Sequence, residues 1–352
     1  MKILDNIDKM KDKSNMRQIL LDFDQQCLKA SKLIENIKIP PEYKDVDNIV
    51  TSGMGGSAIG GDLMRSLFAD SCEIPVVVNR NYTVPTFVNE RTLFMAASYS
   101  GNTEETLSAF KSAQIRGAKL ISMSSGGQLK ELSNEFNNPH IEIPLKGIQP
   151  RCALGYLFIP MMMALSKLEF IPEQDSHLQE AIDLISDTAK KISPEIPTSD
   201  NKAKKLAKKI HGKMPVIYAS QNKFDIVAMR WKGQFNENSK AVAFYNAIPE
   251  MNHNEIVGWG IPEKITKKSI VLILKDKDDM PQISKRMAIT SDLIKETGAK
   301  VKTINTKGNS PLAKALYLIY LGDFTSFYLA ALNDVDPTPI ERISLFKEML
   351  TK

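Results

Sequence analysis

The chain has 352 residues, 43% hydrophobic and 25% charged, a composition typical of about two folded domains and not of a disordered chain. Its 46 basic and 41 acidic residues give a net charge of +5, too small an excess to indicate a nucleic-acid partner. Three scattered cysteines and four scattered histidines exclude a disulfide framework, leave little material for a metal site, and favour a reducing, cytoplasmic location.

The sequence predicts neither a secretory signal nor a membrane span. The first 16 residues are polar and lack the apolar core of a signal peptide. An uncharged run from Cys152 to Leu165 has 14 residues, fewer than the roughly 18 that a membrane helix needs, and Pro160 interrupts it. We therefore interpret this run as a buried helix.

Residues 1–40 are expected to form a helical segment, because apolar side chains recur at helical spacing over residues 16–37. Residues 41–168 then alternate short apolar runs with helical stretches. The strand-like runs are NIVTSG, PVVVN, TLFMAASYS, KLISMSS and HIEIPL. This alternation predicts a domain with a parallel sheet covered by helices on both faces.

Residues 169–212 contain three prolines and polar helical stretches, which predicts a helical connector. The strand-helix alternation resumes over residues 213–352, where the strand-like runs are MPVIYAS, AVAFYN, SIVLILK and KVKTIN. A long helix over 311–333 and a short one over 338–350 follow. The predicted fold class is α/β, with two doubly wound, flavodoxin-like parallel-sheet domains.

The first strand of the chain runs into the glycine-rich segment GMGGSAIGGD, residues 53–62. Its spacing fits the G-x-G-x-x-A variant of the dinucleotide fingerprint, although the next strand ends without the usual acid. Arg80 stands there instead and suits the 2′-phosphate of NADP. The other interpretation is a tight strand-to-helix turn in which glycines allow close packing and Ser57 caps the helix.

The third strand ends in SYSGNTEET, residues 98–106, which places the hydroxyls of Ser98, Ser100 and Thr103 before a helix. Free backbone amides and the positive end of the helix dipole make such a turn suitable for an anion, and an ordinary helix cap has a similar sequence. No lysine follows as in a nucleoside-triphosphate loop. Two such turns after alternate strands favour one ligand, a small molecule that carries a monophosphate.

The pair GMGGSAIGGD and SYSGNTEET resembles the sugar isomerase (SIS) domain, a doubly wound module that binds phosphosugars. PRCALGY, FNENSK, PEMNHNE and ISLFK extend the resemblance along the chain to the bifunctional phosphoglucose/phosphomannose isomerases, which are built from two SIS domains. The resemblance implies interconversion of glucose 6-phosphate and mannose 6-phosphate with fructose 6-phosphate, in glycolysis and gluconeogenesis, without metal or cofactor. It also implies that the substrate's phosphate binds to Gly56, Ser57, Ser98, Ser100 and Thr103.

Aldose-ketose isomerisation requires a base near carbons 1 and 2, a cation for the enediolate and groups that open the sugar ring. By the resemblance, Glu237 in FNENSK is the base, whereas its position alone is typical of a surface carboxylate. Arg151 is the implied cation, because a guanidinium keeps its charge beside the enediolate oxygens. Its alternative role is an ordinary ion pair at the sheet edge.

The resemblance assigns ring opening to His253 and Lys347. An imidazole titrates near neutrality and can pass a proton, and the family contributes this histidine to the partner subunit's site. A homodimer with shared sites is therefore expected. Lys347 lies on an amphipathic terminal helix whose buried side is predicted to carry Ile343 and Phe346. By position alone, both His253 and Lys347 are typical of solvated residues.

Other functions are compatible with the same motifs. They are another SIS isomerase acting on an amino or pentose phosphate, a non-catalytic phosphosugar-binding regulator, and an NADP-dependent oxidoreductase. A regulator normally carries a helix-turn-helix, whereas the first 40 residues offer one good helix. Glu250 and Glu255 flank His253 and are candidates to orient it. Lys314 is interpreted as a helix-surface residue, and Thr338 as a candidate for accepting mannose.

Overall fold

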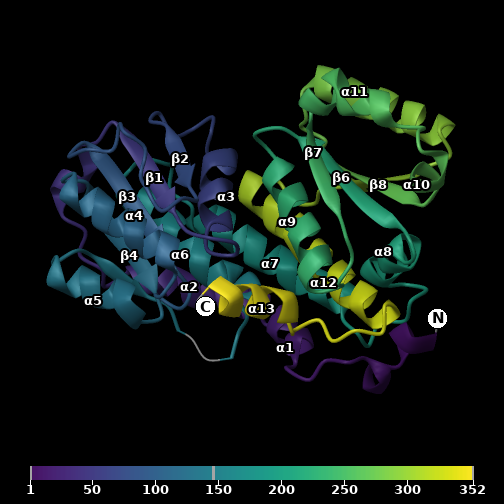
Figure 1. Cartoon of the computed structure of the whole chain (residues 1–352), viewed down its shortest axis with the longest axis horizontal. Helices are drawn as coiled ribbons and strands as arrows, with labels where there is room; N and C mark the ends of the chain where they lie inside the picture. The colour runs from purple at the N-terminus through teal and green to yellow at the C-terminus, as the bar shows by residue number, and fades with distance from the viewer. Residues whose placement is uncertain (1, 145–146, 351–352) are drawn as a thin grey trace. The chain divides into compact units, whose positions relative to one another are not determined.

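The computed structural model describes residues 2–144 and 147–350. Leu145 of the predicted HIEIPL strand and the outermost residues of the predicted domain ranges, 1 and 351–352, lie outside it. The described chain forms two compact units (Figure 1). The N-terminal unit is Asp22–Ile182, and the C-terminal unit combines Met1–Leu21 with Asp183–Lys352.

The boundaries of these units differ from the predicted ranges. Helix α7 (Asp175–Ile192) crosses from one unit into the other, so the expected connector is divided between them. The first residues of the chain belong to the C-terminal unit, where the Asp5 carboxylate accepts hydrogen bonds from the Thr198 N–H at 2.7 Å and hydroxyl at 2.8 Å. The helix predicted over 16–37 is consequently broken, with α1 (Met16–Leu21) and α2 (Phe23–Ser31) in different units.

The N-terminal unit is built on a five-stranded parallel sheet with the order β2-β1-β3-β4-β5. The strands are β1 (Asn48–Ser52), β2 (Val76–Asn79), β3 (Thr92–Ala97), β4 (Lys119–Ser124) and β5 (His140–Glu142). The chain leaves β1 through α3 (Ile59–Leu67) in one direction and β3 through α4 (Glu104–Ile115) in the other. Because crossovers of this kind are right-handed, α3 and α4 cover opposite faces, and the doubly wound prediction is confirmed.

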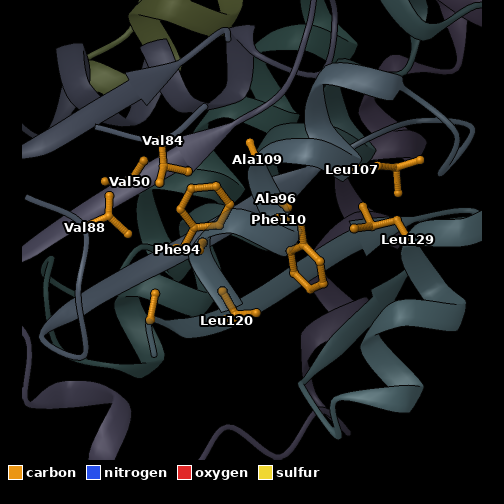
Figure 2. Close-up of a cluster of buried hydrophobic side chains, with 12 residues drawn as sticks. Val50, Val84, Val88, Phe94, Ala96, Leu107, Ala109, Phe110, Leu120 and Leu129 are labelled. Carbon is orange, nitrogen blue, oxygen red and sulfur yellow. The ribbon is translucent and has the colours of Figure 1, made fainter. Parts of the chain in front are cut away.

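The central strands β1 and β3 are mostly apolar and almost wholly buried because helices cover both faces of the sheet. Figure 2 shows Phe94 of β3 and Phe110 of α4 within a cluster that α5 (Gly127–Glu135) completes with Leu129. On the other face, α3 packs on α6 (Leu154–Lys167) so closely that a Cβ on Gly60 would lie 2.8 Å from a carbonyl oxygen of α6. The predicted buried helix after residue 152 is α6.

The C-terminal unit repeats this plan with a four-stranded parallel sheet in the order β7-β6-β8-β9. The strands are β6 (Met214–Ser220), β7 (Phe244–Ile248), β8 (Ser269–Lys275) and β9 (Lys300–Asn305). Helix α9 (Asp225–Glu237) follows β6, and α11 (Pro281–Glu296) covers the opposite face (Figure 1). The remaining helices of this unit are α8 (Lys202–Ile210), α10 (Glu263–Lys267), α12 (Pro311–Leu332) and α13 (Glu341–Leu350).

Short 3-10 helices connect these elements. They are η1 (Lys2–Asp5), η2 (Ile7–Lys9), η3 (Lys32–Ile34), η4 (Pro41–Lys44), η5 (Pro150–Cys152), η6 (Glu250–His253) and η7 (Glu255–Gly258). Three of them, η5, η6 and η7, carry residues that the sequence singled out, which are Arg151, His253 and Glu255.

Helix α12 is the core helix of the C-terminal unit. It is the one described helix long and apolar enough to cross a membrane by length and composition, and 94% of its most apolar window is buried inside the chain. Its two charged residues, Lys314 and Asp323, are also buried and have ionic partners. The interpretation of Lys314 as a helix-surface residue is therefore wrong, because the helix is covered on all sides.

His140 on the edge strand β5 is held by serine hydroxyls of β4. Its Nδ1 lies 2.6 Å from the Ser122 Oγ, and its Nε2 lies 3.4 Å from the Ser124 Oγ. Burial, with a contribution from Lys130 and against the effect of Glu142, lowers the pKa of His140 to about 4. The imidazole is thus neutral at physiological pH, as expected for a partly buried ring between neutral hydroxyls.

We predict that His140 lowers the free energy of unfolding in mild acid. The unfolded chain takes up a proton near its ordinary pKa of 6.5, whereas the folded chain does so only near 4, so stability is lost as the pH drops through this window. Because the ring is partly exposed, the expected loss is about 1–2 kcal/mol, less than the full shift implies. Urea midpoints at pH 7 and 4.5 measure it. His140→Gln should show a smaller loss, and the control His211→Gln, at an exposed site, should match the parent; an equal loss in both variants would contradict the assignment.

Candidate active site

The glycine-rich loop between β1 and α3 touches the segment that begins α6. A Cβ on Gly56 would lie 3.0 Å from the carbonyl carbon and oxygen of Pro150 and 3.1 Å from the Arg151 nitrogen, so glycine permits a backbone-to-backbone approach. Ser57 is buried and makes no cap bond to α3, contrary to the capping interpretation. Its Oγ instead accepts a hydrogen bond from the Tyr99 N–H at 3.1 Å, which joins the two predicted phosphate loops.

The loop after β3 gathers its hydroxyls at the start of α4. The Oγ of buried Ser98 lies 2.9 Å from the Thr103 Oγ1, and Thr103 is the N-cap residue without making a side-chain cap bond. Ser100 is exposed, and its Oγ accepts from the Asn102 N–H at 3.2 Å. The turn passes through Gly101 at φ 73°, a conformation that favours glycine. The structure thus places three hydroxyls at a helix N-terminus, where an anion is favoured.

Arg151 lies on η5, directly before α6, and is buried, with only 4% of its surface exposed. Buried Gln26 of α2 fixes this segment from the other side. Its Nε2 donates to the Cys152 carbonyl at 3.0 Å, and its Oε1 accepts from the Gly155 N–H at 2.7 Å. The predicted phosphate loops and the backbone segment that carries the predicted cation therefore meet at the carboxyl edge of one parallel sheet, where open α/β folds bind ligands.

Arg80 at the end of β2 already has a partner. Its guanidinium forms an ion pair with buried Asp62 of α3, and the Nη1–Oδ1 distance of this pair is 3.3 Å. A 2′-phosphate would have to separate this pair and leave a buried carboxylate uncompensated. The geometry of Arg80 therefore disfavours the NADP-dependent oxidoreductase.

An ion cluster occupies the corresponding edge of the sheet in the C-terminal unit. Asp276, buried after β8, lies 2.9 Å from the Lys223 Nζ and 3.2 Å from the Lys314 Nζ, and accepts from the Thr306 hydroxyl at 2.7 Å. Burial opposes ionisation, but Lys223, Thr306 and Lys314 lower the pKa of Asp276. The described loops at this edge thus hold one another through ion pairs and hydrogen bonds between their side chains. The loops at the matching edge of the N-terminal unit carry hydroxyl groups instead.

Glu237 is the last residue of α9 and is partly exposed. The asparagines on either side of it, Asn236 and Asn238, are both anchored. The Asn238 Nδ2 donates to the Ser326 Oγ of α12 at 2.9 Å, and the Asn236 Oδ1 accepts from the Ala243 N–H at 3.0 Å. The end of α9 is therefore held firmly while the carboxylate of Glu237 keeps access to solvent.

A buried polar network that sequence reasoning missed ties α9 to α12. Asp323 accepts from the Arg230 Nη2 at 2.7 Å and from the Gln234 Nε2 at 2.8 Å. Burial raises the pKa of the Asp323 carboxyl, and Arg230 counteracts this effect. The available signal was an acid within a 22-residue helix that is otherwise almost wholly apolar, because such a residue requires a buried partner.

His253 ends η6 and is exposed on this chain. The segment around it is fixed, because Met251 is fully buried and the Asn252 Nδ2 donates to the Thr290 Oγ1 of α11 at 2.7 Å. Glu250 accepts from the Asn254 Nδ2 at 2.7 Å. The structure therefore presents the imidazole at the surface on an ordered turn.

Lys347 lies on α13, whose residues are all exposed. Ile343 is 41% and Phe346 62% exposed, so the prediction that they face a buried side is wrong for the single chain. Thr338, the candidate for accepting mannose, is buried just before this helix. Over residues 2–144 and 147–350, no three histidine, cysteine or acidic side chains are grouped so as to hold a metal ion.

The chain is similar to known proteins in both sequence and backbone structure. Residues 199–350 match the bacterial phospho-glucose isomerase C-terminal SIS domain. The chain is 44% identical over 337 residues to the bifunctional phosphoglucose/phosphomannose isomerase of Caldicellulosiruptor bescii, covering 96% of this chain and 99% of that protein. It is 36% identical to the protein of the same description from Aquifex aeolicus, covering 91% and 98%. Its backbone resembles Escherichia coli tagatose-6-phosphate ketose/aldose isomerase at a TM-score of 0.67, with 13% identity over 92% and 96% of the chains, which supports the fold alone.

We predict that Gly56→Ala weakens phosphate binding. The new Cβ would press on the Pro150 carbonyl and displace the segment that carries Arg151. Affinity for inorganic phosphate, measured by calorimetry, should fall about tenfold, or about 1.4 kcal/mol. The control is Gly233→Ala on α9, where nothing lies within 4 Å and affinity should not change. Equal affinity in the two variants would show that this contact does not support the anion site.

Proposed function

Because the chain belongs to the family of bifunctional phosphoglucose/phosphomannose isomerases, we propose that its N-terminal unit binds the phosphate of a hexose 6-phosphate at Gly56, Ser57, Ser98, Ser100 and Thr103. The protein is an isomerase that interconverts glucose 6-phosphate and mannose 6-phosphate with fructose 6-phosphate. The observation that supports the assignment of the site is the contact of the Gly56 loop with the backbone at Pro150 and Arg151, because it joins a predicted phosphate loop to the segment that carries a buried arginine.

The proposed reaction starts with opening of the pyranose ring, in which His253 and Lys347 transfer a proton between the hydroxyl of carbon 1 and the ring oxygen. Glu237 then removes the proton from carbon 2 of the aldose, and the electron pair of that bond forms the cis-enediol. Arg151 stabilises the negative charge on the enediolate oxygens. Transfer of the hydroxyl proton from the carbon 2 oxygen to the carbon 1 oxygen, with return of the first proton from Glu237 to carbon 1, gives the ketose, so the step needs neither oxidant nor cofactor.

We propose that a second copy of the chain covers the surface around His253. Apolar side chains are exposed on β7 and on the segments beside it, including Val242 at 68%, Val257 at 85% and Ile261 at 88%. Apolar surface of this kind is typical of an interface between subunits. In such a homodimer the exposed imidazole would enter the partner's site, which supports the shared-site arrangement.

We also propose that the enzyme works in the cytoplasm, in glycolysis and gluconeogenesis, with no nucleic-acid or membrane partner. Its three cysteines, all among the described residues, form no disulfide, and two of them are buried, which suits a reducing compartment. Its phosphorylated sugars are substrates of central carbohydrate metabolism.

The activity is tested with fructose 6-phosphate in the presence of EDTA, with glucose 6-phosphate and mannose 6-phosphate measured separately. Turnover to both sugars at a rate that EDTA does not change is expected. Absence of turnover to either sugar would overturn the proposal.

Replacing the proposed base should remove proton transfer alone. We expect Glu237→Gln to slow isomerisation by at least about 10²-fold, the usual contribution of a positioned base, because the amide cannot accept the proton. Affinity for inorganic phosphate should be unchanged. Glu296→Gln, at the end of α11, changes an exposed glutamate in the same helical position and should keep full activity. Retained activity in Glu237→Gln would show that another group is the base.

The shared site is tested by mixing two inactive proteins. Glu237→Gln chains and His253→Ala chains, unfolded together and refolded as mixed dimers, should recover about a quarter of parental activity. Half of the dimers are then mixed, and each holds one complete site. Dimers whose sites use their own His253 would recover none, and that result would contradict sharing.

A further inference from the structure

The carboxyl group of Glu255, two residues beyond His253, accepts hydrogen bonds from side chains on two strands of the sheet. The hydroxyl of Tyr218 on β6 donates to one carboxyl oxygen of Glu255, and the Asn246 Nδ2 of β7 donates to the other at 2.6 Å. The Trp259 Nε1–H donates to the Tyr218 hydroxyl at 2.9 Å. We call Tyr218, Asn246 and Trp259 around this carboxyl the Glu255 clamp.

The partners in this clamp are themselves fixed. Tyr218 is fully buried in the core cluster between the sheet and α11, and Trp259 packs against the same cluster. The Asn246 Oδ1 accepts from the Ala247 N–H at 2.8 Å, so its amide can present only the nitrogen to Glu255. Burial and the neighbouring Glu255 raise the pKa of Tyr218, which keeps its hydroxyl a donor. The carboxyl of Glu255 is therefore fixed at both oxygens.

The backbone on both sides of His253 is also held in place. The Glu255 N–H donates to the Asn254 Oδ1 at 2.5 Å, which ties the start of η7 to the residue after His253. On the other side of His253, Met251 is fully buried in the core. His253 and Asn254 are thus the exposed residues of a short turn anchored at both ends.

We propose that the Glu255 clamp positions His253 for ring opening, an inference that rests on the proposed function. Glu255 acts on the reaction through the turn, since its carboxyl is engaged by Tyr218 and Asn246. Two directed hydrogen bonds fix the plane of the carboxyl and, with it, the path of the backbone at 253–255. Loss of one bond should misplace the imidazole while the rest of the unit stays folded, and a small misplacement is costly in catalysis.

Anomerisation separates this role from proton transfer. Conversion of α-glucose 6-phosphate to the β form needs only opening and closing of the ring, whereas isomerisation also needs Glu237. Both rates can be measured on one sample by NMR, through magnetisation exchange between the anomers and through appearance of fructose 6-phosphate. We expect Tyr218→Phe to slow both rates by about 10- to 100-fold. Glu237→Gln should slow isomerisation alone.

A control variant, Tyr328→Phe, and a pair of substitutions at Glu255 separate the effect of the Glu255 clamp from a general loss of stability. Tyr328→Phe also removes a buried hydroxyl in this unit, one that donates to the Ile192 carbonyl at 2.6 Å, and should leave both rates within about twofold of the parent. Glu255→Gln keeps an oxygen for Asn246 and gains an N–H for the Tyr218 oxygen, so it should retain more anomerase activity than Glu255→Ala. This pair decides the question if Tyr218→Phe does not fold.

The outcomes are distinguishable. If the parent protein neither anomerises nor isomerises glucose 6-phosphate, the proposed function fails. If the parent does both and folded Tyr218→Phe keeps the anomerisation rate, the clamp does not position His253. Equal anomerisation rates in Glu255→Gln and Glu255→Ala would also overturn the proposal. Parallel loss of both rates in Tyr218→Phe, with Tyr328→Phe unaffected, supports it.

Discussion

The backbone approach at Gly56 is the contact on which the proposed phosphate site depends. Any larger residue would meet the Pro150 carbonyl at 3.0 Å, so the loop after β1 and the segment that carries Arg151 can touch only through glycine. The bond from the Tyr99 N–H to Ser57 adds the loop after β3 to this contact. Three segments distant in sequence thereby converge because β1 and β3 are neighbours and parallel, with their carboxyl ends at one edge.

The four strands of the C-terminal sheet follow the same order as the first four strands of the N-terminal sheet, yet the side chains at the two carboxyl edges differ in chemistry. In the C-terminal unit Lys223 and Lys314 neutralise Asp276, which leaves the edge occupied by its own side chains. Buried ion pairs of this kind are weak sources of stability but strongly fix geometry, because separating them strands a charge. This unit instead carries its proposed acid-base groups where elements end, with Glu237 at the end of α9 and His253 after β7. The same plan therefore carries different side chains at its carboxyl edge in each unit.

Local patterns were sufficient to predict the two parallel sheets, because central strands covered on both faces are mostly apolar and, in the N-terminal unit, turns rich in glycine and hydroxyls follow them. Features set by distant partners were not predictable. Residues 2–21 belong to the C-terminal unit because η1 and α1 contact α12 and Asp5 binds Thr198, and Lys314 is buried with Asp276 as its ionic partner. β7 lies later than the predicted run AVAFYN because it is a half-exposed edge strand with a weak apolar signal.

The same contrast applies to the candidate site residues. Local motifs were sufficient to identify them, but the contacts that hold them in place come from residues distant in the sequence. Nothing in the local sequence of PEMNHNE shows that the carboxyl of Glu255 meets Tyr218, which lies 37 positions earlier. The anchoring has a physical purpose if His253 serves a partner's site. A loose turn would have to be ordered when subunits associate or when substrate binds, and that entropic cost would lower either affinity or rate. A turn already held by the sheet delivers an ordered imidazole, so an exposed histidine on a rigid base suits catalysis shared between subunits.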